Sequence, residues 1–204
     1  MTSKLIDICH ANVRSLNDDI LESVRAELAV ENDIIMLSET NLPHSSLSDM
    51  DITGFQHILR KDRVDRRGGG VAMYVASHLS ATRMSAYEFD DLEAMWVKIK
   101  AGCNTFLFCV CYRTPNSDPN FWVTLQDSLD LARHSGIDNI IFAGDFNSDP
   151  QTREGHLLNM FCKSNDLFCL INEQTRIIAL LPPFSINLFV PQIVTLLEQK
   201  CYHL

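Results

Sequence analysis

An acid and an amide stand two residues apart directly after a strongly apolar run of the chain. They are Asp145 and Asn147 in the sequence Gly-Asp-Phe-Asn at 144–147, and residues 139–143 before them read Asn-Ile-Ile-Phe-Ala. Side chains at positions i and i+2 of an extended chain point to one face, so the acid and the amide are expected to lie together. Carboxylate and amide oxygens are suited to a hard divalent cation such as Mg²⁺. The alternative for this segment alone is a strand that ends in a polar turn.

The apolar run predicts a buried strand, because β-favouring or small residues are bounded there by polar ones. The same reasoning predicts strands at 5–13, 33–39, 55–59, 71–76, 94–100, 105–112 and 167–171. Helical spacing of apolar residues predicts helices over 16–30, 121–134 and 157–165. Several strands follow one another directly, which favours two packed mixed sheets over one doubly wound sheet. No repeat or linker interrupts the chain, so we expect one domain over 1–204.

Composition narrows the class of protein. The chain has 204 residues, 46% of them hydrophobic, which suits one globular domain with a sizeable core. No stretch approaches the roughly 18 uninterrupted apolar residues of a membrane span, so no membrane partner is expected. The seven cysteines form no Cys-x-x-Cys pair, which indicates a reduced, intracellular protein without a zinc site. The net charge of −9 argues against broad adhesion to nucleic acid, although a divalent cation could screen an acidic pocket from a phosphate.

A cluster of basic residues precedes a run of three glycines. The cluster is Arg60, Lys61, Arg63, Arg66 and Arg67, and the glycines occupy 68–70. The cluster is either a solvated loop or a rim that contacts phosphates. The glycines are expected to supply unusual backbone angles where two strands are joined. They lack the spacing of a nucleotide-binding loop.

Three other polar residues end apolar runs. Asn12 ends the first predicted strand, Glu39 the second, and Tyr112 the strand at 105–112. Each has a simple alternative as a turn former, a surface acid or a half-buried edge residue. If these strand ends converge with Asp145 and Asn147, the set forms a carboxylate-and-amide site suited to a hard divalent cation.

Five short motifs occur in a fixed order: His-Ala-Asn-Val-Arg-Ser-Leu at 10–16, Leu-Ser-Glu-Thr at 37–40, Gly-Gly-Gly-Val-Ala at 68–72, Tyr-Arg-Thr-Pro at 112–115 and Gly-Asp-Phe-Asn at 144–147. In this order they resemble the endonuclease/exonuclease/phosphatase superfamily, also called DNase I-like. More narrowly, the sequence is similar to the apurinic-type endonuclease domain of a non-LTR (LINE-type) retrotransposon. The resemblance is clear over 5–177. It implies a four-layered α/β sandwich of two mixed sheets flanked by helices.

The resemblance also implies a role for each matching residue. Glu39 would be the principal ligand of Mg²⁺ or Mn²⁺, and Asn12 would help to hold the metal or the scissile phosphate. Tyr112 would donate a hydrogen bond to the phosphate as negative charge develops. Asp145 would orient or deprotonate the attacking water, and Asn147 would fix the geometry of phosphate and water.

Three arginines are candidates for contact with a DNA substrate, namely Arg113, Arg66 and Arg67.

The region 178–204 departs from the family pattern. Asn187 stands where the family has an aspartate, and the closing Ser-Asp-His of the family is absent. An amide carries no charge with which to orient a partner or a cation. We therefore expect the last strands to be incomplete and the chain to be C-terminally truncated relative to the family.

Three functions stay open at this point. The first is a Mg²⁺-dependent phosphodiesterase that nicks DNA and leaves a 3′-hydroxyl for target-primed reverse transcription. We would then expect a nuclear monomer, with the reverse-transcriptase domain of a parent element as partner if the chain is a fragment. The second is a catalytically inactive remnant or an interaction module. The third is a phosphatase of the same superfamily.

Overall fold

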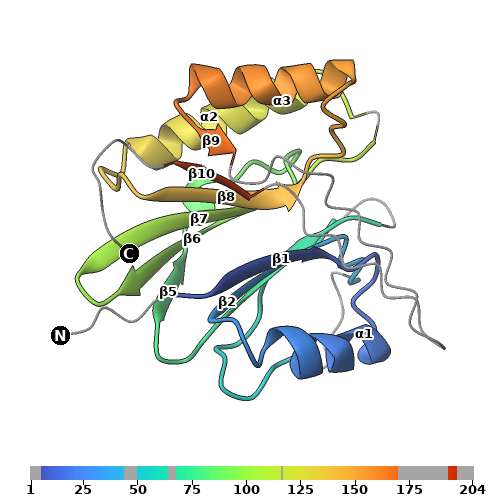
Figure 1. Cartoon of the computed structure of the whole chain (residues 1–204), viewed down its shortest axis with the longest axis vertical. Helices are drawn as coiled ribbons and strands as arrows, with labels where there is room; N and C mark the ends of the chain where they lie inside the picture. The colour runs from blue at the N-terminus through green and yellow to red at the C-terminus, as the bar shows by residue number, and fades with distance from the viewer. Residues whose placement is uncertain (1–5, 44–49, 64–67, 116, 170–192, 197–204) are drawn as a thin grey trace.

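The computed structural model describes residues 6–43, 50–63, 68–115, 117–169 and 193–196, and the structural statements below concern these residues. They form two sheets that pack face to face (Figure 1). The smaller sheet has the strand order β1 (Ile8–Asn12), β2 (Ile34–Ser38), β4 (Val71–Val75) and β3 (Leu59–Lys61). The larger has the order β5 (Ser80–Arg83), β6 (Ala94–Ala101), β7 (Asn104–Tyr112), β8 (Ile140–Asp145), β10 (Ile193–Leu196) and β9 (Phe168–Cys169).

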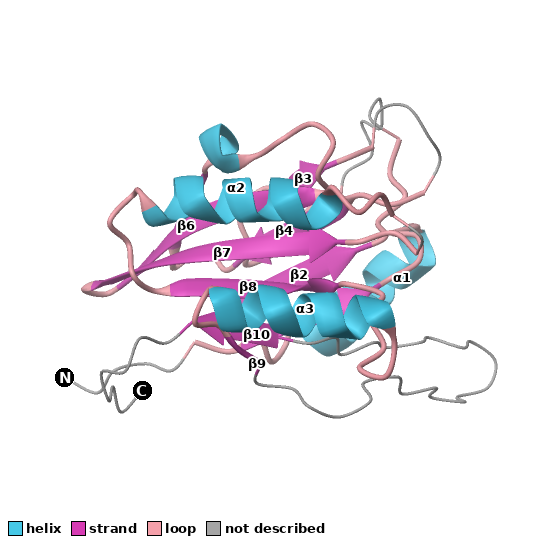
Figure 2. Ribbon diagram, turned by 90° about the horizontal axis from the view of Figure 1, so that it is seen from above, coloured by secondary structure: helices cyan, strands magenta, loops and turns pink. Residues whose placement is uncertain are grey.

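Helices cover the outer face of each sheet, which makes four layers. Helix α1 (Asp18–Ser23) continues directly into the π-helical turn η1 (Val24–Leu28) and lies against the smaller sheet (Figure 1). Helices α2 (Phe121–Arg133) and α3 (Arg153–Ser164) lie side by side over β7 and β8 of the larger sheet (Figure 2). A short 3-10 helix, η2 (Ser85–Tyr87), joins β5 to β6. None of the helices in the described ranges is long and apolar enough to span a bilayer.

Three apolar clusters hold the layers together. The central cluster lies between the sheets and includes Met36 and Met73 of one sheet and Val97 and Val110 of the other, all fully buried. The second lies under α2 and α3, where Trp96 packs edge-on against other aromatic side chains of the core. The third lies under α1 and contains residues such as Leu37 and Tyr74. Burial of this apolar surface is the main force that stabilises the sandwich.

Local sequence explains where several elements begin. The Asn17 side chain accepts a hydrogen bond from the backbone N–H of Ile20 and so caps the first turn of α1. Thr152 accepts from the N–H of Gly155 in the same way, which is why α3 begins at Arg153 rather than at 157. The continuously apolar β2 is buried along its whole length, as a strand covered on both faces should be.

The prediction of two packed mixed sheets flanked by helices is confirmed. Two local predictions are wrong. The strand expected at 55–59 lies at Leu59–Lys61, because the partners of Val71–Met73 in β4 begin only there, and Phe55 makes an isolated bridge to Ala76. The single helix expected over 16–30 divides into α1 and a π-helical turn. The predicted incompleteness of the last strands concerns residues that lie mostly outside the described ranges.

Candidate active site

Each sheet contains one parallel strand pair, and the ends of the two pairs meet. In the smaller sheet β1 runs parallel to β2, with Asn12 opposite Ser38 at their carboxyl ends. In the larger sheet β7 runs parallel to β8, with Tyr112 opposite Asp145 at theirs. Glu39 follows β2 directly. The packing of the sheets brings these four strand ends to one place between them.

The Asn12 side chain joins the two sheets. Its Nδ2 donates one hydrogen bond to Glu39 Oε1 at 2.9 Å and another to Asp145 Oδ2 at 2.7 Å. Its Oδ1 accepts from the backbone N–H of Arg14 at 3.1 Å, which fixes the orientation of the amide. Asn12 is 4% exposed and Asp145 8%, so water screens these contacts poorly. One amide group therefore holds two carboxylates from different sheets beside each other.

The turn after β8 fixes the second oxygen of the Asp145 carboxylate. The backbone N–H of Asn147 donates to Asp145 Oδ1 at 2.9 Å, and the Asn147 side chain donates to the carbonyl oxygen of Arg113 at 2.7 Å. Asn147 has a φ of 45° and is exposed to solvent. The acid and the amide of the Gly-Asp-Phe-Asn segment thus lie in one hydrogen-bonded turn.

Backbone strain is concentrated around the site. Among the described residues, five that are not glycine have positive φ, and four of them flank the strand ends: Arg14 at 54°, Glu39 at 54°, Asn41 at 52° and Asn147 at 45°. Each such residue costs about 1–3 kcal/mol and persists only where surrounding contacts hold it. Strain of this kind clusters at functional sites. It could not be read from the sequence, because none of these positions is a glycine.

The Tyr112 hydroxyl lies beside Glu39. Burial, and next the hydrogen bond with Glu39, raises the pKa of Tyr112 well above that of a free tyrosine. The phenol therefore keeps its proton across the physiological range and acts as a hydrogen-bond donor. This state is the one required of a group that donates to a phosphate.

A neutral histidine stands two residues before Asn12 in β1. His10 is 2% exposed, and neither of its ring nitrogens has a hydrogen-bond partner in the described part of the chain. Burial lowers the pKa of His10 to about 3, so the ring carries no charge near neutral pH. His10 therefore supplies no positive charge to balance Glu39 and Asp145.

Arg113 is buried inside the protein and is not exposed beside the site. It is 4% exposed, its guanidinium lies 5.8 Å from the ring centres of both Phe121 and Trp122, and its Nη1 donates to the carbonyl oxygen of Phe146 at 3.3 Å. A guanidinium placed in this way supports the turn that carries Asn147. This placement favours a positioning role over the direct contact with DNA that we expected.

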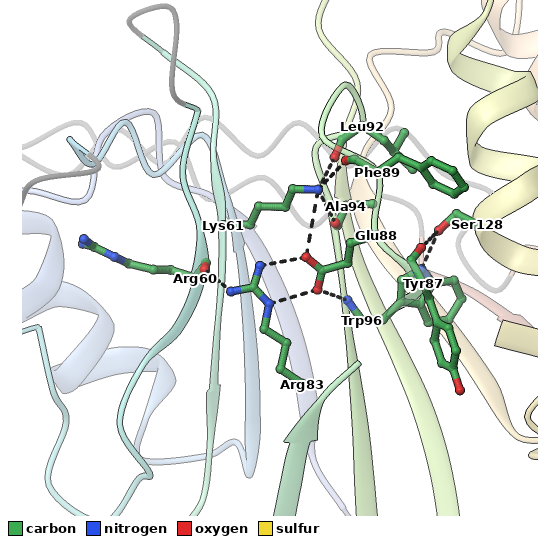
Figure 3. Close-up of polar contacts among 10 residues, drawn as sticks. All are labelled: Arg60, Lys61, Arg83, Tyr87, Glu88, Phe89, Leu92, Ala94, Trp96 and Ser128. Carbon is green, nitrogen blue, oxygen red and sulfur yellow. Dashed lines mark hydrogen bonds and ion pairs between the residues drawn. The ribbon is translucent and has the colours of Figure 1, made fainter. Parts of the chain in front are cut away.

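Three members of the basic cluster are bound to other parts of the protein. Arg60 pairs with Asp62 at 3.1 Å, and Arg63 pairs with Glu93. Lys61 Nζ donates to backbone carbonyl oxygens of residues 89, 92 and 94 (Figure 3). These contacts within the protein indicate a structural role for the three residues rather than a role in binding phosphates. Arg66, Arg67 and Asn187 lie outside the described residues.

The donor set fits a hard divalent cation. Glu39 and Asp145 each retain carboxylate lone pairs. Asn12 presents its amide nitrogen to both carboxylates, and its Oδ1, which accepts from the N–H of Arg14, keeps one lone pair. Within the described ranges neither carboxylate forms an ion pair with a lysine, arginine or histidine, and no group of three or more His, Cys, Asp and Glu side chains gathers to hold a metal. Two carboxylates and an amide are the sparse ligand set that Mg²⁺ accepts, because it keeps several of its own waters.

Known proteins are similar to this chain in sequence pattern and in fold. The model of the endonuclease/exonuclease/phosphatase family matches residues 9–161. The chain therefore belongs to the endonuclease/exonuclease/phosphatase family, whose members include nucleases and phosphatases. No curated protein matches the chain by sequence.

Solved structures share the fold at low sequence identity. The endonuclease domain of TRAS1, a telomere-specific non-LTR retrotransposon, has a TM-score of 0.67 and 15% identity over 94% of this chain and 85% of its own. A 3′-5′ exonuclease from Neisseria meningitidis has a TM-score of 0.60 and 14% identity over 93% and 86%. A mannosyl-6-phosphatase from Bacteroides thetaiotaomicron has a TM-score of 0.56 and 15% identity over 94% and 85%. These likenesses establish the fold.

Proposed function

We propose that this chain is a Mg²⁺-dependent phosphodiesterase that nicks DNA and leaves a 3′-hydroxyl. The observation that carries the proposal is the Asn12 amide, which holds Glu39 of one sheet and Asp145 of the other within hydrogen-bond distance of a single nitrogen. Paired carboxylates without a protein cation in the described residues suit a metal-assisted hydrolysis. Mn²⁺ could replace Mg²⁺, because it prefers the same oxygen ligands.

The residues around this pair divide the work of hydrolysis. Asp145 orients the attacking water and accepts its proton, because both its oxygens are fixed by the amide of Asn12 and the backbone of Asn147. Tyr112 stays protonated, and its single O–H would turn from Glu39 to the phosphate. Glu39, with the amide oxygen of Asn12, would hold the cation. A bound Mg²⁺ polarises the phosphoryl oxygen and stabilises the departing alkoxide.

DNA is the substrate that the comparisons favour. The TRAS1 domain is an endonuclease of a retrotransposon, and a further neighbour of the fold is a 3′ phosphatase from Neisseria with a bound DNA product. The net charge of −9 means that the cation must offset the repulsion between the site and a phosphate backbone. A role in target-primed reverse transcription follows from this proposal, with a monomer in the nucleus and a reverse-transcriptase domain as partner.

Nicking of supercoiled plasmid in the presence of Mg²⁺ tests the proposal. Asp145→Asn and Glu39→Gln each remove one charge at nearly constant shape, and each should lower the nicking rate about 10²-fold or more. Asp127→Asn on the exposed face of α2 is the matched control and should leave the rate unchanged. Nicked ends should be extended directly by a DNA polymerase, as a 3′-hydroxyl requires.

Two results would replace the proposal by another function. Release of phosphate from a small phosphoester, with plasmid left intact, would favour a phosphatase; the mannosyl-6-phosphatase has the same fold. Absence of both activities, together with a melting temperature that does not respond to Mg²⁺, would favour a catalytically inactive remnant or an interaction module.

A further inference from the structure

The strained backbone of Glu39 is held by the glycine segment that precedes β4. The two residues after Glu39 donate their backbone N–H groups to that segment, Thr40 to the carbonyl oxygen of Gly70 at 3.3 Å and Asn41 to that of Gly69 at 2.8 Å. Glu39 itself has a φ of 54°. The position of its carboxylate therefore depends on where the glycine segment lies.

An ion pair holds the glycine segment in turn. The backbone N–H of Gly70 donates to Glu93 Oε2 at 2.7 Å, and Glu93 Oε1 pairs with Arg63. The pair lies directly against Gly69, where an added Cβ would overlap both Glu93 and Arg63. Both charged side chains are 19% exposed, so the pair is well shielded from water. The glycine segment is thus fixed from the side of the larger sheet.

Glu93 also contacts the strand that carries Tyr112. Its backbone carbonyl oxygen accepts from the N–H of Tyr112 at 2.8 Å. The Glu93 side chain binds the glycine segment that positions Glu39. The Glu93 backbone binds Tyr112, and the hydroxyl of Tyr112 contacts Glu39 in turn. One residue therefore contacts the supports of two site groups that belong to different sheets.

The segment around Glu93 is itself anchored to the smaller sheet (Figure 3). Lys61 of β3 reaches across and donates to the carbonyl oxygens of Phe89 at 2.6 Å, Leu92 at 2.8 Å and Ala94 at 3.4 Å. These oxygens lie on both sides of Glu93 in the sequence. The ammonium group thus leaves little freedom to the loop from which the Glu93 side chain projects.

We propose that Glu93, paired with Arg63, is a positioning residue that sets the Glu39 carboxylate relative to Tyr112 and Asp145. Its meaning for catalysis rests on the phosphodiesterase activity proposed above, whereas its structural effect does not. Outer contacts of this kind change metal affinity or activity by about 10-fold to 100-fold when they are removed.

The test compares Glu93→Ala with Glu93→Gln and a control. Glu93→Ala removes both contacts and should raise the Mg²⁺ concentration for half-maximal nicking about 10-fold or more. Glu93→Gln keeps an oxygen for the N–H of Gly70 and should recover part of that loss. Arg25→Gln breaks an ion pair with Glu22 of α1, on the outer side of the smaller sheet and outside the contacts of Lys61, and should leave the Mg²⁺ dependence near wild type.

A measurement without activity keeps the inference separate from the proposed function. Tyrosines labelled at ¹³Cζ report the hydrogen bond of each phenol, and Tyr112→Phe identifies the resonance of Tyr112. Glu93→Ala should move this resonance towards that of a free tyrosine, while Arg25→Gln should not. An unmoved resonance, or equal effects of the two variants on Mg²⁺ dependence, would overturn the positioning role. If the wild type shows no nicking but the resonance moves, only the proposed function fails.

Discussion

Replacement of Asn12 by aspartate should turn the shared amide into a third negative charge. The amide nitrogen donates to Glu39 and Asp145 at 2.9 Å and 2.7 Å, and an introduced carboxylate oxygen would meet both acids without a proton between them. Hydrogen bonds to charged groups contribute about 1.5–3 kcal/mol each. Because Glu39 is only half-buried, the lower value applies, and loss of both bonds should cost about 3 kcal/mol.

Like-charge repulsion adds to this loss. Two unit charges about 4 Å apart interact with about 4 kcal/mol at an effective dielectric constant of about 20, which is an upper bound for each new pair. Asn12→Leu is the matched control, because it removes the donor at similar size and adds no charge. For a domain of this length 1 kcal/mol shifts the melting temperature by about 2–4 °C. Asn12→Leu should therefore lower it by about 6–12 °C, and Asn12→Asp by more.

The response to Mg²⁺ should follow the opposite order: the variant that loses more stability without the cation should gain more from its addition. A ligand at about 100 times its dissociation constant stabilises the folded state by about 2.7 kcal/mol. A third carboxylate strengthens binding of the cation, and the leucine removes a ligand. The rise in melting temperature on addition of Mg²⁺ should therefore be largest for Asn12→Asp, intermediate for the wild type and smallest for Asn12→Leu. Equal rises in all three proteins, measured by thermal unfolding at near-neutral pH, would refute the assignment of Asn12 to the cation site.

Two further substitutions test the supports of the site. Gly144→Ala places a Cβ against the carbonyl of Cys111 in the neighbouring strand and should cost about 1–3 kcal/mol in denaturant unfolding, whereas Gly102→Ala, in open space with a φ of 60°, should cost about 1 kcal/mol. A small loss at Gly144 would contradict the close approach of β7 and β8. Arg113→Lys loses the stacking on Phe121 and Trp122 and should lower the nicking rate about 10-fold or more, since the turn with Asn147 shifts; unchanged kinetics would contradict this positioning.

The sequence predicted the buried strands well, because each is a short apolar run bounded by polar residues. It did not predict β5, whose residues Ser80–Arg83 are largely exposed and carry no apolar alternation. The π-helical turn after α1 was also missed, since apolar spacing does not distinguish it from a continued α-helix. Edges and helix irregularities depend on tertiary contacts that no local pattern encodes.

The site was predictable in its members but not in its supports. Asn12, Glu39, Tyr112 and Asp145 each follow an apolar run, so strand ends alone pointed to them. Glu93 had no such signal, because it stands in a loop after two aspartates and acts through a backbone group of the other sheet. Interactions of this kind appear only when the packing of the two sheets is known.

The location of the site follows from the directions of the strands. Ends of parallel neighbours fall at the same edge of a sheet, so β1 with β2 and β7 with β8 each present two carboxyl ends together. The central apolar cluster packs the two sheets together, so these two edges lie next to each other. The side chains at the edges are polar, because the apolar strands have ended there. Asn12 lies where the two edges meet, and a shift of either sheet would separate its two acceptors. Packing of the core is therefore what brings two acids to one amide, and a substitution deep between the sheets should alter Mg²⁺ dependence without touching the site.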